Sequence, residues 1–134
     1  MADRRELTLL DTHIWIWSVE HDQRLSNKHF EIIDSSPENL AISVVSCWEI
    51  AMLVSKGRIK LDRPLRDWLE RATTSSAIHV LPLTPIIAAE AYELPGTFHE
   101  DPADRLIVAT ARVHKCLLLT EDSKILDYSH VKTT

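Results

Sequence analysis

The feature that most constrains this chain is a repeated alternation between short apolar, β-branched runs and longer segments with helical periodicity. Two of the runs are LAISVV at 40–45 and CLLLT at 116–120, and each is followed by a helix-period segment. Strands that alternate with amphipathic helices are typical of βαβ units and a parallel sheet. The pattern therefore predicts an α/β fold in which helices cover both faces of a central, mostly parallel, twisted sheet.

Length and composition predict how many domains this fold fills. The chain has 134 residues, of which 45% are hydrophobic and 26% are charged, and this is the profile of one globular domain. We therefore expect residues 1–134 to form a single domain. Cys47 and Cys116 lack a CxxC spacing and lie among apolar residues, so we expect both to be buried, reduced thiols.

Two further properties concern location and charge. No apolar run approaches the ~20 residues that cross a bilayer, and residues 1–6 (MADRRE) lack the apolar stretch of a signal peptide. We therefore expect a cytoplasmic protein with no membrane association. The net charge of −5 argues against a protein that coats nucleic acid without specificity, but it does not exclude a nuclease.

Strand and helix signals divide the chain into elements. Predicted strands cover 7–10, 40–45, 78–83, 116–120 and 128–131. Predicted helices begin after Asp11 and Ser26 and cover 47–56, 65–72, 85–93 and 102–114, with a short helix after Asp122. The helix after Ser26 is expected to bury Leu25, Phe30 and Ile33.

Capping signals refine two of these helices. Ser46 is the expected N-cap of helix 47–56, and Ser46 with Glu49 fits the S-x-x-E capping box, which offers a structural explanation for Glu49. Asp101 and Pro102 are the expected N-cap and first residue of helix 102–114.

Acidic residues recur where the predicted strands end. Asp11 follows the first strand, Glu49 lies just beyond the second, Asp104 opens a helix and Asp122 follows the last buried strand. Ligands of open parallel sheets bind beyond the carboxyl ends of the strands, so these four side chains are expected to converge there. Capping of helix N-termini is the structural alternative for such acids.

Converging carboxylates indicate a hard divalent cation. They repel one another unless a positive charge lies between them, and oxygen ligands select Mg²⁺ or Mn²⁺. The seven histidines are scattered without zinc-like spacing, which argues against a zinc site. Such a cation acidifies water and neutralises phosphate charge, so the acids point to phosphodiester hydrolysis.

Four segments carry a family resemblance: LLDTHIWIW at 9–17, SVVSCWEIA at 43–51, LPGTFHEDPADRLIVATA at 94–111 and LLLTED at 117–122. In this order they resemble the motifs of PIN-domain ribonucleases, and most closely the VapC toxins of bacterial type II toxin–antitoxin systems. The resemblance implies a three-layer α/β/α fold and an endoribonuclease that uses Mg²⁺ or Mn²⁺. It assigns the metal ligands and catalytic acids to Asp11, Glu49, Asp104 and Asp122.

The same resemblance implies the partners. Members of this family cleave RNA, form homodimers and are inhibited by a cognate VapB-like antitoxin, which inserts a C-terminal segment into the acidic site. A net charge of −5 suits a basic antitoxin tail without proving one.

Several residues near the motifs have two interpretations. Asp101 is a helix cap or an additional ligand, and only one of Glu121 and Asp122 is expected to point inward, with the resemblance favouring Asp122. Thr12 and Thr120 either orient a carboxylate or a metal-bound water, or cap the helices that follow.

Other polar and aromatic residues also have both a functional and a structural interpretation. His13 either contacts the phosphate or is packed, and Arg105 pairs with an acid, a substrate phosphate or a structural partner. The basic segment 56–66 either binds the RNA backbone or is a solvated loop, with the loop slightly favoured. Trp48 and Trp68 lie in helical apolar patterns, so they are expected in the core or at an interface.

Competing functions are distinguished by specific residues. A haloacid-dehalogenase-type phosphatase requires a second acid two residues after the first, where this chain has His13. A receiver domain requires a phosphoacceptor after a middle strand and a lysine after the last strand, and neither is found at a matching position. A non-catalytic PIN-like interaction module remains the alternative outside the enzymes.

Overall fold

The computed structural model describes residues 6–75 and 77–134. The expectation about a leader segment falls almost entirely on residues 1–5, which lie outside the described residues. Within the described ranges, no helix is both long and apolar enough to cross a membrane.

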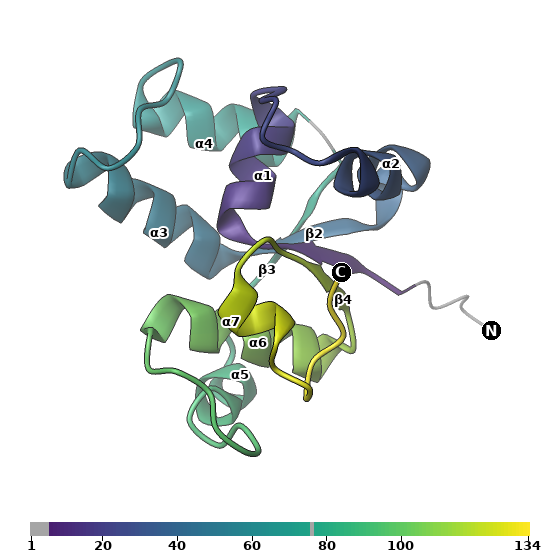
Figure 1. Ribbon diagram of the computed structural model, residues 1–134. Coiled ribbons are helices and arrows are strands. Elements are labelled where there is room, and N and C mark those ends of the chain that lie inside the picture. The colour runs from purple at the N-terminus through teal and green to yellow at the C-terminus, as the bar shows by residue number, and fades with distance from the viewer. Residues whose placement is uncertain (1–5, 76) are drawn as a thin grey trace.

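A parallel sheet forms the centre of the described chain (Figure 1), and its strands are arranged in the order β3-β2-β1-β4. Its strands are β1 (Thr8–Leu10), β2 (Leu40–Ser43), β3 (His79–Leu81) and β4 (Leu117–Leu119). Every pairing is parallel, with Leu9 opposite both Ala41 and Leu118. The predicted parallel α/β sheet is therefore confirmed, and β3 lies at one edge.

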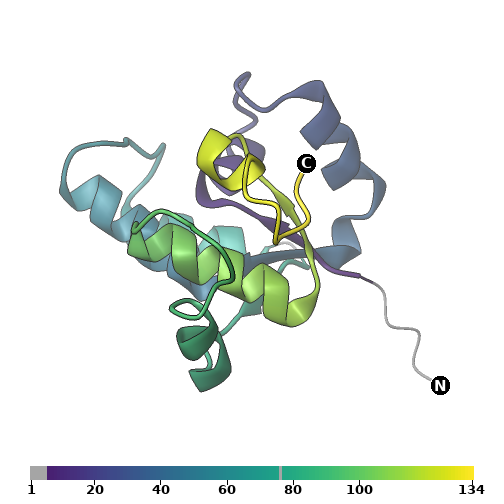
Figure 2. The ribbon, with the colours of Figure 1, turned by 60° about the horizontal axis from the view of Figure 1, so that its bottom comes forward.

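Helices cover both faces of this sheet. They are α1 (Thr12–Val19), α2 (Asn27–Ser35), α3 (Val44–Ser55), α4 (Leu65–Thr74), α5 (Pro85–Glu90), α6 (Pro102–His114) and α7 (Ser123–Leu126), together with the short 3₁₀ helix η1 (Pro37–Asn39). The long helix α6 packs next to α3 and α5 (Figure 2).

Alternating strand residues divide the core into two layers. Leu9 and Leu118 pack in one cluster with the apolar side chains of α6 and α7. Leu10 and Leu119 pack in the other cluster with those of α1, α3 and α4. Because successive strand residues face opposite sides, leucine runs bury both faces of the sheet. The arrangement is the predicted three-layer fold.

The boundary between β2 and α3 differs from the sequence prediction. The strand ends at Ser43 rather than Val45, and the helix begins at Val44. Ser43 is the N-cap, with its Oγ accepting a hydrogen bond of 3.0 Å from the Val45 backbone N–H. The predicted Ser46 cap and its capping box with Glu49 are therefore wrong, because the cap geometry outweighed the β propensity of two valines.

The start of α6 follows the sequence prediction. The helix covers Pro102–His114, and the Asp101 carboxylate accepts a 2.9 Å hydrogen bond from the Asp104 backbone N–H. Asp104 therefore lies in the first helical turn, where its side chain faces the end of the sheet.

Three further predictions are wrong in detail. Phe30 is 53% exposed and the buried residue of α2 is His29, which is 1% exposed and whose Nε2 lies 2.9 Å from the Thr134 carbonyl oxygen. The helix predicted to reach residue 93 ends at Glu90. The strand predicted at 128–131 is not formed. Instead, the Leu118 N–H donates to the Lys132 carbonyl oxygen, and the Leu118 carbonyl oxygen accepts from the Thr134 N–H.

The tryptophans and cysteines divide between core and surface. Trp68 is 2% exposed, as expected of a core residue, whereas Trp48 is 57% exposed and is not in the core. Both cysteines are free, and Cys116 is buried, but Cys47 is only half-buried. Burial raises the pKa of both thiols, that of Cys116 to about 11.

Candidate functional site

An acidic cleft of about 640 Å³ lies at the carboxyl ends of the strands. Six carboxylate side chains line it, from the ends of β1 and β4 and from α3, α6 and the segment before α6: Asp11, Glu49, Asp101, Asp104, Glu121 and Asp122. All four acids that the sequence singled out therefore line one cavity. The convergence follows from the parallel topology, which brings the carboxyl ends of the strands to one edge.

Asp11 is held by hydrogen bonds to both of its oxygens. The Thr12 backbone N–H donates to Oδ1 at 2.9 Å, and the Thr120 hydroxyl donates to Oδ2 at 2.7 Å. Burial raises the pKa of Asp11, and these two hydrogen bonds partly oppose the rise. Asp11 thus caps α1, as the structural alternative expected, and also faces the cleft.

Glu49 has no capping role, because it lies in the second turn of α3. The Thr12 hydroxyl donates to Glu49 Oε1 at 2.6 Å and lies 2.8 Å from the Ser46 hydroxyl oxygen. Burial raises the pKa of Glu49, and the negative charges of Asp11 and Asp101 raise it further. Ser46 was expected to be a cap, but it supports the threonine that orients Glu49.

Asp104 also has a strongly perturbed carboxyl group. Burial raises its pKa to about 8, with further contributions from the charges of Asp11, Asp101, Asp122 and Glu49. The Nε2 atom of His99 lies 3.0 Å from Asp104 Oδ2, close enough for an ion pair, although its N–H is not aligned for a hydrogen bond. These contributions arise because the negative charges of the neighbouring acids repel that of ionised Asp104.

The remaining acids of the cleft also have structural partners. Asp122 caps α7 through a 2.9 Å hydrogen bond from the Lys124 backbone N–H, and its own N–H donates to the Thr120 hydroxyl. Asp101 caps α6. Glu121 lines the cleft beside Asp122, and its Oε2 lies 3.3 Å from Nδ1 of the buried His29.

The structure shows the surroundings of two basic residues in the motifs, Arg105 and His13. Among the residues that the structure describes, Arg105 pairs with no acid, and it does not line the cleft. Its guanidinium donates to the carbonyl oxygens of Ala91, Phe98 and His99, each at 2.9 Å. It therefore fixes the loop before α6. His13 is exposed and lines the acidic cleft, so of its two interpretations the packed one does not hold.

The carboxylates of the cleft suit a magnesium or manganese ion that keeps part of its water shell better than an ion fully enclosed by protein ligands. Among residues 6–75 and 77–134, no three His, Cys, Asp or Glu side chains are gathered closely enough to coordinate an ion by themselves. Mg²⁺ keeps several waters and uses only one or two carboxylates. An open cleft of mutually repelling carboxylates meets this requirement.

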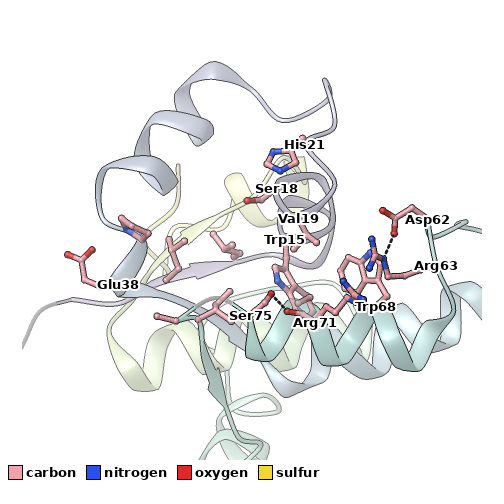
Figure 3. A pocket seen from close by; sticks show the side chains of 16 residues that line it. Trp15, Ser18, Val19, His21, Glu38, Asp62, Arg63, Trp68, Arg71 and Ser75 are labelled. Atoms are coloured by element: carbon pink, nitrogen blue, oxygen red, sulfur yellow. Dashed lines mark hydrogen bonds and ion pairs between the residues drawn. The ribbon is translucent and has the colours of Figure 1, made fainter.

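A second cavity of about 600 Å³ lies between α1 and α4 (Figure 3). Trp15 and Trp68 form much of its wall, and Asp62 and Arg63 lie at its rim. Its acidic lining residues are matched by arginines, so it lacks the excess negative charge that attracts a cation. The acidic cleft is therefore the candidate active site.

Sequence reasoning missed two polar residues of the acidic cleft, His99 and Lys124. His99 lies within segment 94–111, which carries the family resemblance, but its spacing does not indicate the contact with Asp104. Nothing in the spacing of Lys124 indicates a role. Both Glu121 and Asp122 line the cleft, so the expectation that only one of them points inward is wrong.

The fold and cleft together define a class: three-layer α/β proteins with a carboxylate site at the carboxyl ends of a parallel sheet. Within that class, the family model of the PIN domain matches residues 8–131, and the chain belongs to this family.

Individual relatives agree with this assignment. The chain is 38% identical over 122 residues to Ribonuclease VapC22 of Mycobacterium tuberculosis (strain ATCC 25618 / H37Rv), covering 91% of this chain and 92% of the relative. Among solved structures, VapBC2 from Rickettsia felis bound to a promoter DNA fragment matches with a TM-score of 0.70 and 17% identity, covering 96% and 97% of the two chains. A toxin–antitoxin complex from Klebsiella pneumoniae matches with a TM-score of 0.66 and 18% identity, covering 95% of each chain. These structures share the fold.

Proposed function

We propose that this protein is a metal-dependent endoribonuclease of the VapC toxin type. The observation that carries the proposal is the acidic cleft, in which burial and four neighbouring carboxylates raise the pKa of Asp104 to about 8. A group that resists ionisation this strongly favours a bound cation. The 38% identity to Ribonuclease VapC22 supports RNA as the substrate.

The four acids would hold Mg²⁺ or Mn²⁺ at the end of the sheet. Asp11, Glu49, Asp104 and Asp122 are the proposed ligands, and Asp101 is kept as a helix cap at the rim of the cleft. The bound cation supplies an acidified water and neutralises charge on the phosphate during in-line displacement.

Two threonines position these carboxylates. The Thr12 hydroxyl fixes Glu49, and the Thr120 hydroxyl fixes Asp11, so both acids are presented in one orientation before substrate arrives. Hydrogen bonds of this kind orient a ligand and limit the reorganisation that the reaction requires.

The partners follow from the same family. We propose that a VapB-like antitoxin blocks the cleft and that the toxin is a cytoplasmic homodimer. The Klebsiella pneumoniae toxin–antitoxin complex, which shares the fold, supports the antitoxin. An antitoxin segment that enters a cleft with six carboxylates would gain from a positive charge. Sedimentation of the purified protein tests the dimer.

The test is cleavage of RNA by protein freed from any co-purifying partner. Total RNA and structured tRNA are incubated with Mg²⁺ or Mn²⁺, with EDTA and the Asp11→Asn variant as controls. We expect discrete cuts that require the metal and the Asp11 carboxylate. Full activity of both Asp11→Asn and Asp104→Asn would refute the ligand assignment. An absence of cleavage and of Mn²⁺ binding in calorimetry would favour a non-catalytic interaction module.

A further inference from the structure

Beside the acidic cleft lies a cavity of about 440 Å³, which we call the flanking pocket. It shares His99 and Lys124 with the acidic cleft, so the two hollows adjoin. Its volume falls within the range of small-molecule sites. The residues that line it come from the loop before α6 and from α7 and the segment after it: Gly96, Thr97, Phe98, His99, Lys124, Asp127, Tyr128, Ser129 and His130.

Charge indicates which way a nucleic-acid strand leaves the acidic cleft. Apart from histidines, Lys124 is the one cationic side chain among the described residues that line it, against six carboxylates. Lys124 is exposed, and within residues 6–75 and 77–134 its ammonium has neither an ion pair nor a hydrogen bond. A phosphate next to the one being cleaved is therefore attracted toward Lys124 and repelled elsewhere.

Aromatic rings line the flanking pocket beyond that lysine. The ring centroids of Phe98 and Tyr128 lie 4.9 Å apart, and those of Tyr128 and His130 lie 5.4 Å apart. The Tyr128 hydroxyl donates to the Pro95 carbonyl oxygen at 2.5 Å, which fixes its ring as a support. His130 is exposed, so its ring is available to a ligand.

Gly96 lies against the His130 ring. Its φ of +67° is the left-handed conformation that glycine adopts readily, and a Cβ there would lie 3.4 Å from His130 Nε2. A side chain at position 96 would therefore strain the backbone, while its Cβ would be in van der Waals contact with the ring.

We propose that the flanking pocket binds the nucleotide next to the scissile phosphate in single-stranded RNA. Lys124 binds its phosphate, the His130 ring stacks on its base, and the Asp127 carboxylate accepts hydrogen bonds from base amino groups. Stacking on aromatic rings together with a cationic contact is the usual way proteins hold single strands. The proposal rests on the ribonuclease function proposed above and adds where the substrate continues.

The test measures RNA affinity in the cleavage-deficient Asp11→Asn protein. The probe is a fluorescein-labelled, 12-nucleotide single-stranded RNA that spans a site cut by the wild-type protein. We expect His130→Ala to weaken binding about tenfold and His130→Phe to restore it, because stacking needs only a ring. Lys124→Gln is expected to weaken binding and to lower the slope of log affinity against log salt by about 0.7. The control is Lys28→Gln, an exposed lysine of α2 that lines neither hollow.

An abasic substitution identifies the stacked nucleotide. An RNA that lacks the base on one side of the cut should bind the Asp11→Asn parent as weakly as the intact RNA binds the His130→Ala variant. The same abasic RNA should bind the His130→Ala variant no more weakly than the intact RNA does. The proposal is overturned if both pocket variants bind like Lys28→Gln, or if Lys60→Gln in the basic loop is the variant that loses affinity. Failure of the wild-type protein to cut any RNA would overturn the ribonuclease function itself, and this result is seen before any pocket variant is measured.

Discussion

Thr12 and Thr120 show how single hydroxyls determine the geometry of the acidic cleft. Each is buried beneath a carboxylate and donates one short hydrogen bond to it. A buried carboxylate without such a donor would rotate or take up a proton more readily, since burial already raises the pKa of both Asp11 and Glu49. These threonines therefore act on the proposed chemistry through the acids.

Replacement of Thr120 by valine removes its hydroxyl while conserving its shape. We expect Thr120→Val to reduce ribonuclease activity about 10- to 100-fold and to raise the Mg²⁺ concentration needed for half-maximal rate, because Asp11 loses its donor. Thr120→Ser should restore both.

Thr110 provides the matched control for this experiment. It is equally buried, and its hydroxyl donates to the Leu106 carbonyl within α6. Thr110→Val should keep the wild-type metal requirement. Equal effects of the two valine substitutions would show that the Thr120 hydroxyl matters only for packing.

At the scale of elements, Arg105 joins α6 to the loop that precedes it. Its donors satisfy three carbonyl oxygens, one at the end of α5 and two immediately before α6. The same loop carries His99, which contacts Asp104. The position of one side of the cleft therefore depends on a residue that does not line it.

A lysine at this position cannot reproduce the planar guanidinium. We expect Arg105→Lys to lower the free energy of unfolding by about 2 kcal/mol, because carbonyl oxygens in the loop lose their donors. Urea denaturation measures this as a lower midpoint with an unchanged slope. The control is Arg66→Lys at an exposed arginine of α4, which should not change the urea midpoint. An unchanged midpoint for Arg105→Lys would contradict the proposed role of Arg105.

Elements also show how far the sequence predicts this structure. The order of β1 to β4 and of the α-helices, and the whole of α6, were predicted, because long periodic segments and the Asp-Pro start are local signals, but the strand predicted at 128–131 is absent from the described residues. The end of β2 was misplaced because Ser43 and Ser46 are both plausible caps, and the path of the backbone decides between them.

The candidate site, too, was predicted only in part. The meeting of the four acids was predicted from the parallel topology alone. The neighbours of those acids were not: the contacts of His99 with Asp104 and of Glu121 with His29 depend on how loops run in three dimensions. No spacing within one sequence encodes them.

For the whole molecule, the acidic cleft makes stability depend on pH. The pKa of Asp104 is raised from 3.8 to about 8, so between these values the folded protein binds a proton that the unfolded chain releases. The contribution of this group to stability is therefore most favourable below pH 3.8, falls as pH rises, and reaches its full penalty above about pH 8.

Asp104→Asn removes that titration. In EDTA, we expect the variant to melt a few degrees above the wild type at pH 9 and to differ little at pH 4.5. Thermal unfolding at both pH values measures this, and one transition is expected if residues 1–134 form a single domain. Addition of Mg²⁺ should stabilise the wild type more than the variant. A melting difference that is the same at both pH values would exclude the titration of Asp104 as its cause.

The proposed ligands come from positions as far apart as Asp11 and Asp122, and β4 completes the sheet by pairing with β1. A growing polypeptide on the ribosome therefore has no complete cleft until β4 and Asp122 have emerged and folded against the first strand. The cell that makes this toxin would meet its cleaving activity only in molecules whose β4 has folded onto the sheet, which leaves the time needed to synthesise residues 11–122 for an inhibitor to be made as well.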